Sequence, residues 1–245
     1  MSDSTLVETY KHRGCTIEVH RDESAESPRG DCNLGTMVCW HNRYNLGDEQ
    51  PKRDDPNDYL RRLVGKSATD EEWEVMMDED EKLDRGEWES ISDSWVETLL
   101  KNHFVVLPLY LYDHSGITIS TGRFSCPWDS GQVGFIYMEL DKAKKEFTCT
   151  DEADLRKKAE AYLEQEVKTY DQYLTGAVYG YDALDWEGDS IDSCWGFFGY
   201  EETEEDSYMV SEAIASIDRY IDKEYYKKAA QPGEVDAVEL EEEEV

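Results

Sequence analysis

Positive charge is scarce in this chain: 25 Lys and Arg face 58 Asp and Glu, which gives a formal net charge of −33 over 245 residues. A surface this negative repels nucleic-acid phosphates and anionic lipid headgroups. We therefore expect no direct binding to nucleic acid and none to a membrane. The charge suits a partner protein with a basic surface or, as halophilic adaptation, a salt-rich cytoplasm, and the sequence leaves both explanations open.

Long apolar runs are also missing. No stretch approaches the roughly 18 apolar residues of a membrane-spanning helix, and the longest run, residues 104–112, has the length of a strand. The first residues lack the basic and apolar regions of a secretory signal, so we expect a cytoplasmic protein whose six Cys are reduced thiols. No phosphate-binding glycine motif occurs, which argues against a parallel nucleotide-binding sheet.

The rest of the composition predicts a folded protein. Hydrophobic residues make up 39 % of the chain, including 16 Tyr and 7 Trp, which is enough for a core. We expect an α+β fold, mainly an antiparallel sheet with inserted and C-terminal helices, as a single domain over 1–230 with an acidic, disordered tail over 231–245. The expected strands are 6–10, 15–20, 36–40, 104–112, 117–120, 133–138, 177–184 and 191–198, and the expected helices are 56–64, 69–77, 92–100, 151–170 and 208–228.

Three local signals make this prediction more specific. Arg13 and Gly14 separate the first two strands and predict a tight turn. Thr69, followed by three acidic residues, predicts the N-cap of a helix. Pro108 has no backbone N–H to donate, so its place in the strongest strand predicts a sheet edge or a bulge there.

One segment differs from the rest of the chain in its low charge. Residues 107–137 contain three acidic or basic residues besides His114, namely Asp113, Arg123 and Asp129, although 34 % of the chain is charged. The same segment concentrates glycine and small polar residues. This pattern predicts a buried or functionally constrained segment.

Two motifs in this segment carry a resemblance. Residues 112–116 read YDHSG and residues 126–134 read CPWDSGQVG, with a weaker element, RYNLGD, at 43–48. They resemble a family of uncharacterised proteins carried by phages, viruses and other mobile elements. The resemblance implies a viral or mobile-element accessory protein in the cytoplasm of a host cell. It implies no activity and no catalytic residues.

The motifs also contain residue types that act together in catalysis. Cys126 as nucleophile, His114 as base and Asp129 as orienting acid would make a small hydrolase or transferase. In the alternative reading, Cys126 packs as a small apolar residue while Asp113 and Asp129 accept hydrogen bonds from loop amides. The sequence does not decide between an enzyme and a structured loop that contacts a partner.

Binding candidates extend beyond the motifs. His41, Arg43 and Asp48 follow the third expected strand and could converge on the same place. The full set of binding candidates is Arg43, Asp48, Asp113, Trp128 and Gln132.

An acidic hairpin turn is the candidate metal site. Asp185, Glu187 and Asp189 offer the oxygen ligands that Ca²⁺ or Mg²⁺ prefers. The pattern fails the EF-hand spacing, because residue 196 is Gly where a bidentate Glu would be needed. A salt-adapted domain that binds a ligand or a divalent metal is therefore a further alternative, next to a solvated acidic turn.

Runs of carboxylates give the interaction hypothesis a sharper form. The acidic stretches are residues 70–81, 201–206 and 239–244. Carboxylates spaced a few ångströms apart imitate DNA, which carries one phosphate charge per roughly 1.7 Å of duplex. The chain would then be a DNA-mimic-like inhibitor of a host DNA-binding or defence factor. The alternative is that each stretch is a solvated face.

Overall fold

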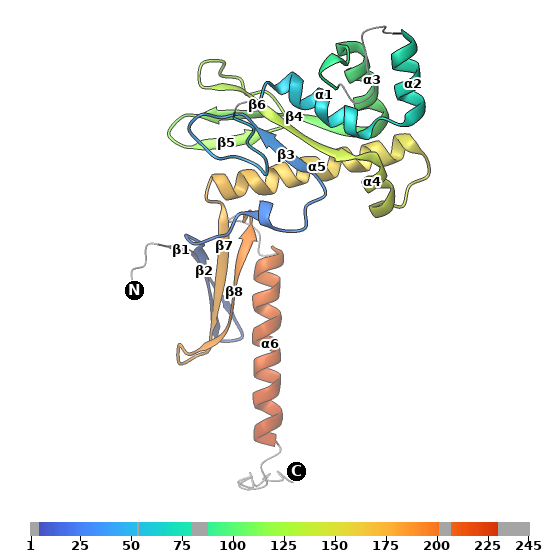
Figure 1. Cartoon of the computed structure of the whole chain (residues 1–245). Helices are drawn as coiled ribbons and strands as arrows, with labels where there is room; N and C mark the ends of the chain where they lie inside the picture. The colour runs from blue at the N-terminus through green and yellow to red at the C-terminus, as the bar shows by residue number, and fades with distance from the viewer. Residues whose placement is uncertain (1–4, 53, 80–87, 201–206, 230–245) are drawn as a thin grey trace, which may run out of the picture. The chain divides into compact units, whose positions relative to one another are not determined.

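The computed structural model describes residues 5–52, 54–79, 88–200 and 207–229 (Figure 1). It has the predicted α+β fold with antiparallel strands, and these strands form two sheets. The chain forms two compact units, unit 1 with residues 1–23 and 178–245 and unit 2 with residues 24–177, where the sequence predicts a single domain. The predicted tail, 231–245, lies outside the described residues. Within the described ranges, no helix combines the length and apolar character needed to cross a membrane.

Unit 1 is a four-stranded sheet packed against one helix (Figure 1). The turn between its first two strands is formed by Arg13 and Gly14, both with positive φ (49° and 86°), as a two-residue hairpin requires. Strand alternation puts the buried side chains of Ile17 and Val19 on one face, and α6 covers this face with Ala213 and Ile217. The sheet order is β1 (Leu6–His12), β2 (Cys15–Arg21), β7 (Val178–Leu184) and β8 (Ser190–Phe198), and the helix is α6 (Tyr208–Ala229).

The division into two units follows from one strand pair. β2 pairs with β7, with Ile17 opposite Ala183, so the sheet of unit 1 joins segments far apart in the sequence. All residues of unit 2 lie between these two strands in the chain. Short-range patterns predict each strand but contain no information on this long-range pairing, so they predict one continuous domain.

Unit 2 has helices on both faces of its sheet. The order of the sheet is β3 (Thr36–Cys39), β6 (Ser130–Glu139), β4 (Phe104–Asp113) and β5 (Ile117–Ser120). One face packs on α5 (Glu152–Leu174) through a buried stripe at helical spacing, and α4 (Leu140–Glu146) continues this core. The other face packs against α1 (Pro56–Ser67) and α3 (Asp93–His103), and α2 (Asp70–Glu79) joins the same core cluster through Trp73 and Met76. The short helices η1 (Pro28–Gly30) and η2 (Trp88–Ser90) complete the unit.

Pro108 lies where its missing N–H is tolerated. β4 pairs with β6 along its whole length but with β5 only from Tyr110 to Asp113. The β4–β6 register also shifts between Leu109 and Tyr110. Pro108 therefore has a strand neighbour on one side and lies next to an irregularity, as the sequence predicts.

The N-terminus of α2 is held by a reciprocal cap. Thr69 N–H donates to Glu72 Oε2 (2.8 Å), and Glu72 N–H donates to Thr69 Oγ1 (3.2 Å). Asn102 Nδ2 lies 2.9 Å from Glu72 Oε1 and His103 Nε2 lies 2.7 Å from Glu72 Oε2, so the carboxylate also ties α2 to the end of α3. Partial burial opposes the charge of Glu72, but these hydrogen bonds outweigh it and lower the pKa to about 2.

This pKa predicts a defined acid response. A carboxyl whose pKa is lower in the folded state stabilises the fold above its unfolded pKa, and that contribution is lost as pH falls towards the folded pKa. We expect Glu72→Gln to lower the free energy of unfolding at neutral pH, and the difference from wild type to shrink between pH 4.5 and about 2. Urea unfolding at several pH values measures this, with the exposed Glu74→Gln as control. A difference that is constant with pH would contradict it.

Candidate functional site

The motif residues surround a hollow of about 340 Å³ at one end of the sheet of unit 2. The hollow forms because β3 ends at Cys39, opposite Gly134, whereas β6 extends back to Ser130. Trp40 N–H still donates to the Val133 carbonyl (2.8 Å). Residues 130–132 of β6 then pair with β4 on one side, and no strand in the described part of the chain pairs with them on the other. Side chains around the opening include Trp40, His41, Asp113, Trp128, Asp129 and Gln132.

One wall of the hollow is tied together by Asp113. Arg43 Nη1 lies 3.1 Å from Asp113 Oδ2, and the Tyr44 hydroxyl donates to Asp113 Oδ1 (3.2 Å). His41 stacks on Tyr44 with ring centroids 5.0 Å apart, and its Nδ1 accepts the backbone N–H of Tyr44. The structure thus brings His41 and Arg43 together with Asp113, which lies 70 positions from Arg43 in the sequence.

Asp129 lies at the centre of the predicted catalytic group. Its Oδ2 is 3.3 Å from His114 Nδ1 and 3.6 Å from Cys126 Sγ. A nucleophilic thiol needs the imidazole next to the sulfur, with the carboxylate behind the imidazole. Here the carboxylate contacts both. Cys126, His114 and Asp129 are therefore neighbours, but they meet in an order that differs from the proposed nucleophile–base–acid arrangement.

Trp128 points away from the protein. Its side chain is 92 % exposed, whereas tryptophan is highly buried on average. The loop that carries it is well supported. Tyr112 stacks near Phe124 and His114 (ring centroids 5.7 and 6.0 Å apart), and Asp113 N–H donates to the Asp129 carbonyl (2.8 Å). A large apolar side chain held in solvent beside a hollow is typical of a binding surface.

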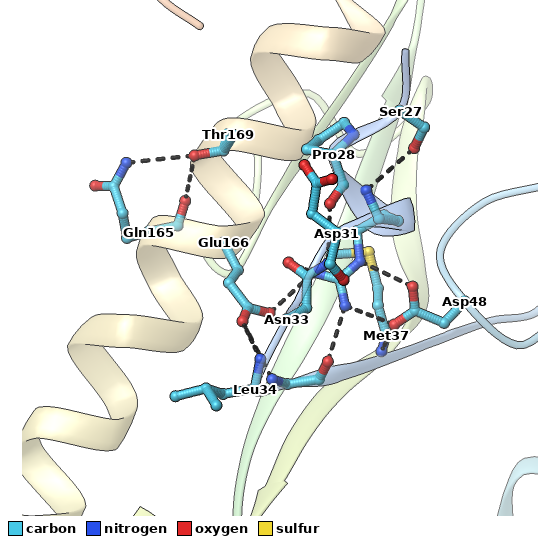
Figure 2. A network of polar contacts seen from close by, with 12 residues as sticks. Ser27, Pro28, Asp31, Asn33, Leu34, Met37, Asp48, Gln165, Glu166 and Thr169 are labelled. Carbon is cyan, nitrogen blue, oxygen red and sulfur yellow. Dashed lines mark hydrogen bonds and ion pairs between the residues drawn. The ribbon is translucent and has the colours of Figure 1, made fainter. Parts of the chain in front are cut away.

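Asp48 belongs to a different cluster, which Figure 2 shows. Its carboxylate receives two hydrogen bonds from Arg29, Nε to Oδ1 at 2.9 Å and Nη2 to Oδ2 at 2.5 Å, and one from Met37 N–H (2.7 Å). The contacts position the start of β3, because Met37 lies in that strand. Asp48 therefore has its polar atoms engaged within the fold, and the geometry supports a structural role for it.

Arg29 and Glu166 complete this cluster, which we call the Arg29 network. The Arg29 side chain is only 5 % exposed, and its Nη1 lies 2.9 Å from Glu166 Oε2. Glu166 Oε1 accepts the N–H groups of Leu34 (2.7 Å) and Gly35 (3.2 Å). Burial opposes the positive charge of Arg29, but Asp48 and Glu166 outweigh it and raise the pKa of the guanidinium.

The sequence reasoning missed Arg29 and Glu166, although one signal was present. Glu166 interrupts the apolar stripe of α5, where its neighbours Leu163, Val167 and Tyr170 are all buried. A charged residue at a core position requires a buried partner. The identity of that partner, 137 positions away, was not encoded in any local pattern.

The candidate metal residues form a turn. Asp185 Oδ1 accepts the backbone N–H groups of Glu187 and Asp189, both at 2.9 Å. The hydrogen bond from Asp189 N–H is the main cause of a lowered Asp185 pKa. Across the described residues, no three His, Cys, Asp or Glu side chains gather in a way that could hold a metal ion. The Ca²⁺ or Mg²⁺ hypothesis stays a prediction, and the turn geometry accounts for Asp185 without it.

Much of the DNA-mimic hypothesis falls on residues outside the described ranges. These are stretches 201–206 and 239–244, together with the end of 70–81. Within α2, Glu72 is engaged in the cap, and the remaining acidic side chains are exposed.

Comparisons with protein-family models, curated proteins and solved structures found no match. The motif resemblance therefore remains an expectation, and function has to be argued from the geometry of the chain.

Proposed function

We propose that this chain is an acidic interaction protein, a viral or mobile-element accessory factor, that binds a basic segment of a host protein at the Trp128 hollow. The observation that carries this proposal is the exposure of Trp128, at 92 %, on a supported loop beside an unfilled hollow. Tryptophan is enriched among the few residues that dominate interface energies. An exposed indole on a supported loop offers a large apolar surface that a partner can bury.

Charge decides which partner would fit. The chain carries a net charge of −33, and Asp113 and Asp129 line the hollow next to Trp128. A Lys or Arg side chain placed there would meet carboxylates and the face of an indole, which attracts cations. The overall negative field would also steer a basic protein towards the chain and make association faster at low salt.

The backbone supports an extended binding segment. Beyond the end of β3, no strand among the described residues pairs with residues 130–132 of β6 on the side of the hollow. A peptide can add to such an edge through main-chain hydrogen bonds while its side chains enter neighbouring hollows. A basic, extended segment therefore matches both the charge and the backbone of this site.

Inhibition by DNA mimicry is a finer version of the same proposal. Its support is the net charge and the exposed carboxylates of α2. A helix of ten residues is about 15 Å long, so α2 alone would imitate only a short piece of duplex. A partner that binds DNA, and that the chain displaces from DNA, would support this version.

Replacing Trp128 by alanine tests the proposal. We expect Trp128→Ala to weaken binding of the partner at least tenfold, because it removes the apolar anchor, while the melting temperature stays within about 1 °C, because the side chain packs against little else. The tagged protein would be used to isolate partners from its host, and affinities would be measured by calorimetry at two salt concentrations.

The matched control is Trp186→Ala, which removes another exposed tryptophan, 57 % exposed, from unit 1. Support requires a basic partner whose binding falls with salt and with Trp128→Ala but not with Trp186→Ala. If wild type, Trp128→Ala and Trp186→Ala all bind the partner equally well, the Trp128 hollow is not the docking site.

A second candidate function is supported by the convergence of Cys126, His114 and Asp129. If the thiol is a nucleophile, Cys126 should react with iodoacetamide at neutral pH at least tenfold faster than the exposed Cys32 and Cys194, and His114→Ala should abolish the difference. Because the carboxylate lies between imidazole and thiol, we expect Cys126 to react no faster than these two. Mass spectrometry of the alkylated peptides decides between the outcomes.

A further inference from the structure

The sheet of unit 1 has a second face that α6 does not cover. α6 packs against the face of β2 and β7 that includes Ile17, Val19 and Ala183. Strand alternation places Glu18, His20, Gly180 and Asp182 on the opposite face. Trp195 of β8 lies on the same face. It is the cross-strand partner of Gly180, and Gly180 is the cross-strand partner of His20.

Two carboxylates face each other on this surface. Glu18 is the direct cross-strand partner of Asp182, and like charges at directly opposite positions destabilise a sheet. His20 is the nearby group that could offset them. Its Nε2 lies 3.5 Å from Glu18 Oε2 and 3.9 Å from Asp182 Oδ2, longer than good hydrogen bonds.

The His20 imidazole is itself incompletely satisfied. Its Nε2 is buried and has no hydrogen-bond partner, which is true of no other buried side-chain nitrogen or oxygen atom among the described residues. Its other nitrogen, Nδ1, lies 3.3 Å from Thr5 Oγ1. A buried polar atom without a hydrogen-bond partner is unfavourable.

An indole forms the platform next to these groups. A Cβ atom at Gly180 would lie 2.4 Å from Cδ2 and Cε3 of Trp195, so the ring occupies the space that the glycine leaves free. A register shift between Tyr179 and Gly180, with Gly196 at φ 86°, marks a bulge next to Trp195. The Trp195 side chain is still 46 % exposed, and its ring centroid is 6.1 Å from that of His20.

We infer that this face of unit 1 binds an arginine side chain of a protein partner. A guanidinium is planar and stacks on aromatic rings, and its N–H groups pair with carboxylates. Stacked on Trp195, it would donate to Glu18 and Asp182 and separate their charges. A lysine ammonium has no planar face to stack. All of these residues belong to unit 1, so the inference does not rest on the Trp128 hollow.

The test follows the indole N–H signal of Trp195 by ¹H–¹⁵N NMR spectroscopy of the full-length protein. The probe is the peptide Ac-Gly-Arg-Gly-NH2, compared with its citrulline analogue, which keeps the shape of the side chain but lacks the charge. We expect a saturable shift of the Trp195 signal with the arginine peptide and binding at least fivefold weaker with citrulline. Glu18→Gln combined with Asp182→Asn should weaken arginine binding to the citrulline level.

Trp186 provides the internal control, since it is an exposed indole in the same unit next to an acidic turn. Its signal should not move in parallel with that of Trp195, and Trp186→Phe should leave the affinity unchanged. Equal binding of arginine and citrulline peptides, equal binding of the corresponding lysine peptide, or parallel shifts of both indole signals would overturn the inference. Failure here would leave the Trp128 prediction untouched, because the two tests use residues of different units.

Discussion

Replacing Glu166 by glutamine is expected to lower the free energy of unfolding of unit 2 by about 3 kcal/mol. The substitution keeps the size of the side chain but removes the charge that faces Arg29, whose guanidinium is almost fully buried. Removing one partner of a buried ion pair leaves the other charge uncompensated, which typically costs about 3–5 kcal/mol. The amide would also turn a donor towards Arg29 or towards the N–H groups of Leu34 and Gly35, which need an acceptor.

Urea unfolding followed by fluorescence measures this effect. The control is Glu164→Gln, an exposed residue on the same helix, which should change stability by less than about 0.5 kcal/mol. If the two variants unfold at the same urea concentration, Glu166 does not stabilise the fold through the Arg29 network. If the loss is confirmed, the network is part of the framework that holds the start of β3 against α5.

Gly134→Ala is expected to have a comparably large effect through the backbone. A Cβ atom at this position would lie 1.9 Å from the Val38 carbonyl oxygen, far inside contact distance. Since backbone atoms cannot rotate away, β3 would have to separate from β6, and we expect a loss of about 3 kcal/mol. Trp40 and His41 directly follow β3 and line the hollow, so binding at the Trp128 site should weaken as well.

Gly131→Ala is the matched control, because it lies in the same strand and an added Cβ would meet nothing within 4 Å. Its stability should stay within about 1 kcal/mol of wild type in thermal unfolding. Similar losses for both glycines would mean that strand propensity, and not the close approach of Val38, sets the requirement at Gly134.

The sequence predicted those parts of the fold that depend on neighbours in the chain. The turn at Arg13 and Gly14, the cap at Thr69 and the apolar stripe of α5 all arise from residues within a few positions of one another. The pairing of β2 with β7 joins residues far apart in the sequence. No local pattern contains that pairing, so it could not be predicted.

The same distinction applies to the site. The low charge of 107–137 predicts a constrained segment, and in the structure His41, Arg43 and Asp113 lie close together at its edge. Sequence reasoning could not predict that Asp129 would lie between His114 and Cys126, because the order of three contacts depends on how separate loops pack. Sequence reasoning also could not predict that Asp48 pairs with Arg29, because Arg29 lies in no distinctive sequence motif.

The split sheet of unit 1 has a consequence for synthesis on the ribosome. β1 and β2 are made first but have to wait for β7 and β8, whereas all of unit 2 has been translated by residue 177. During this interval β2 pairs with β1 alone, and its apolar residues Ile17 and Val19 lack the cover of α6. An apolar strand with an open edge invites association with other chains. The strong negative charge would oppose such encounters through repulsion between chains.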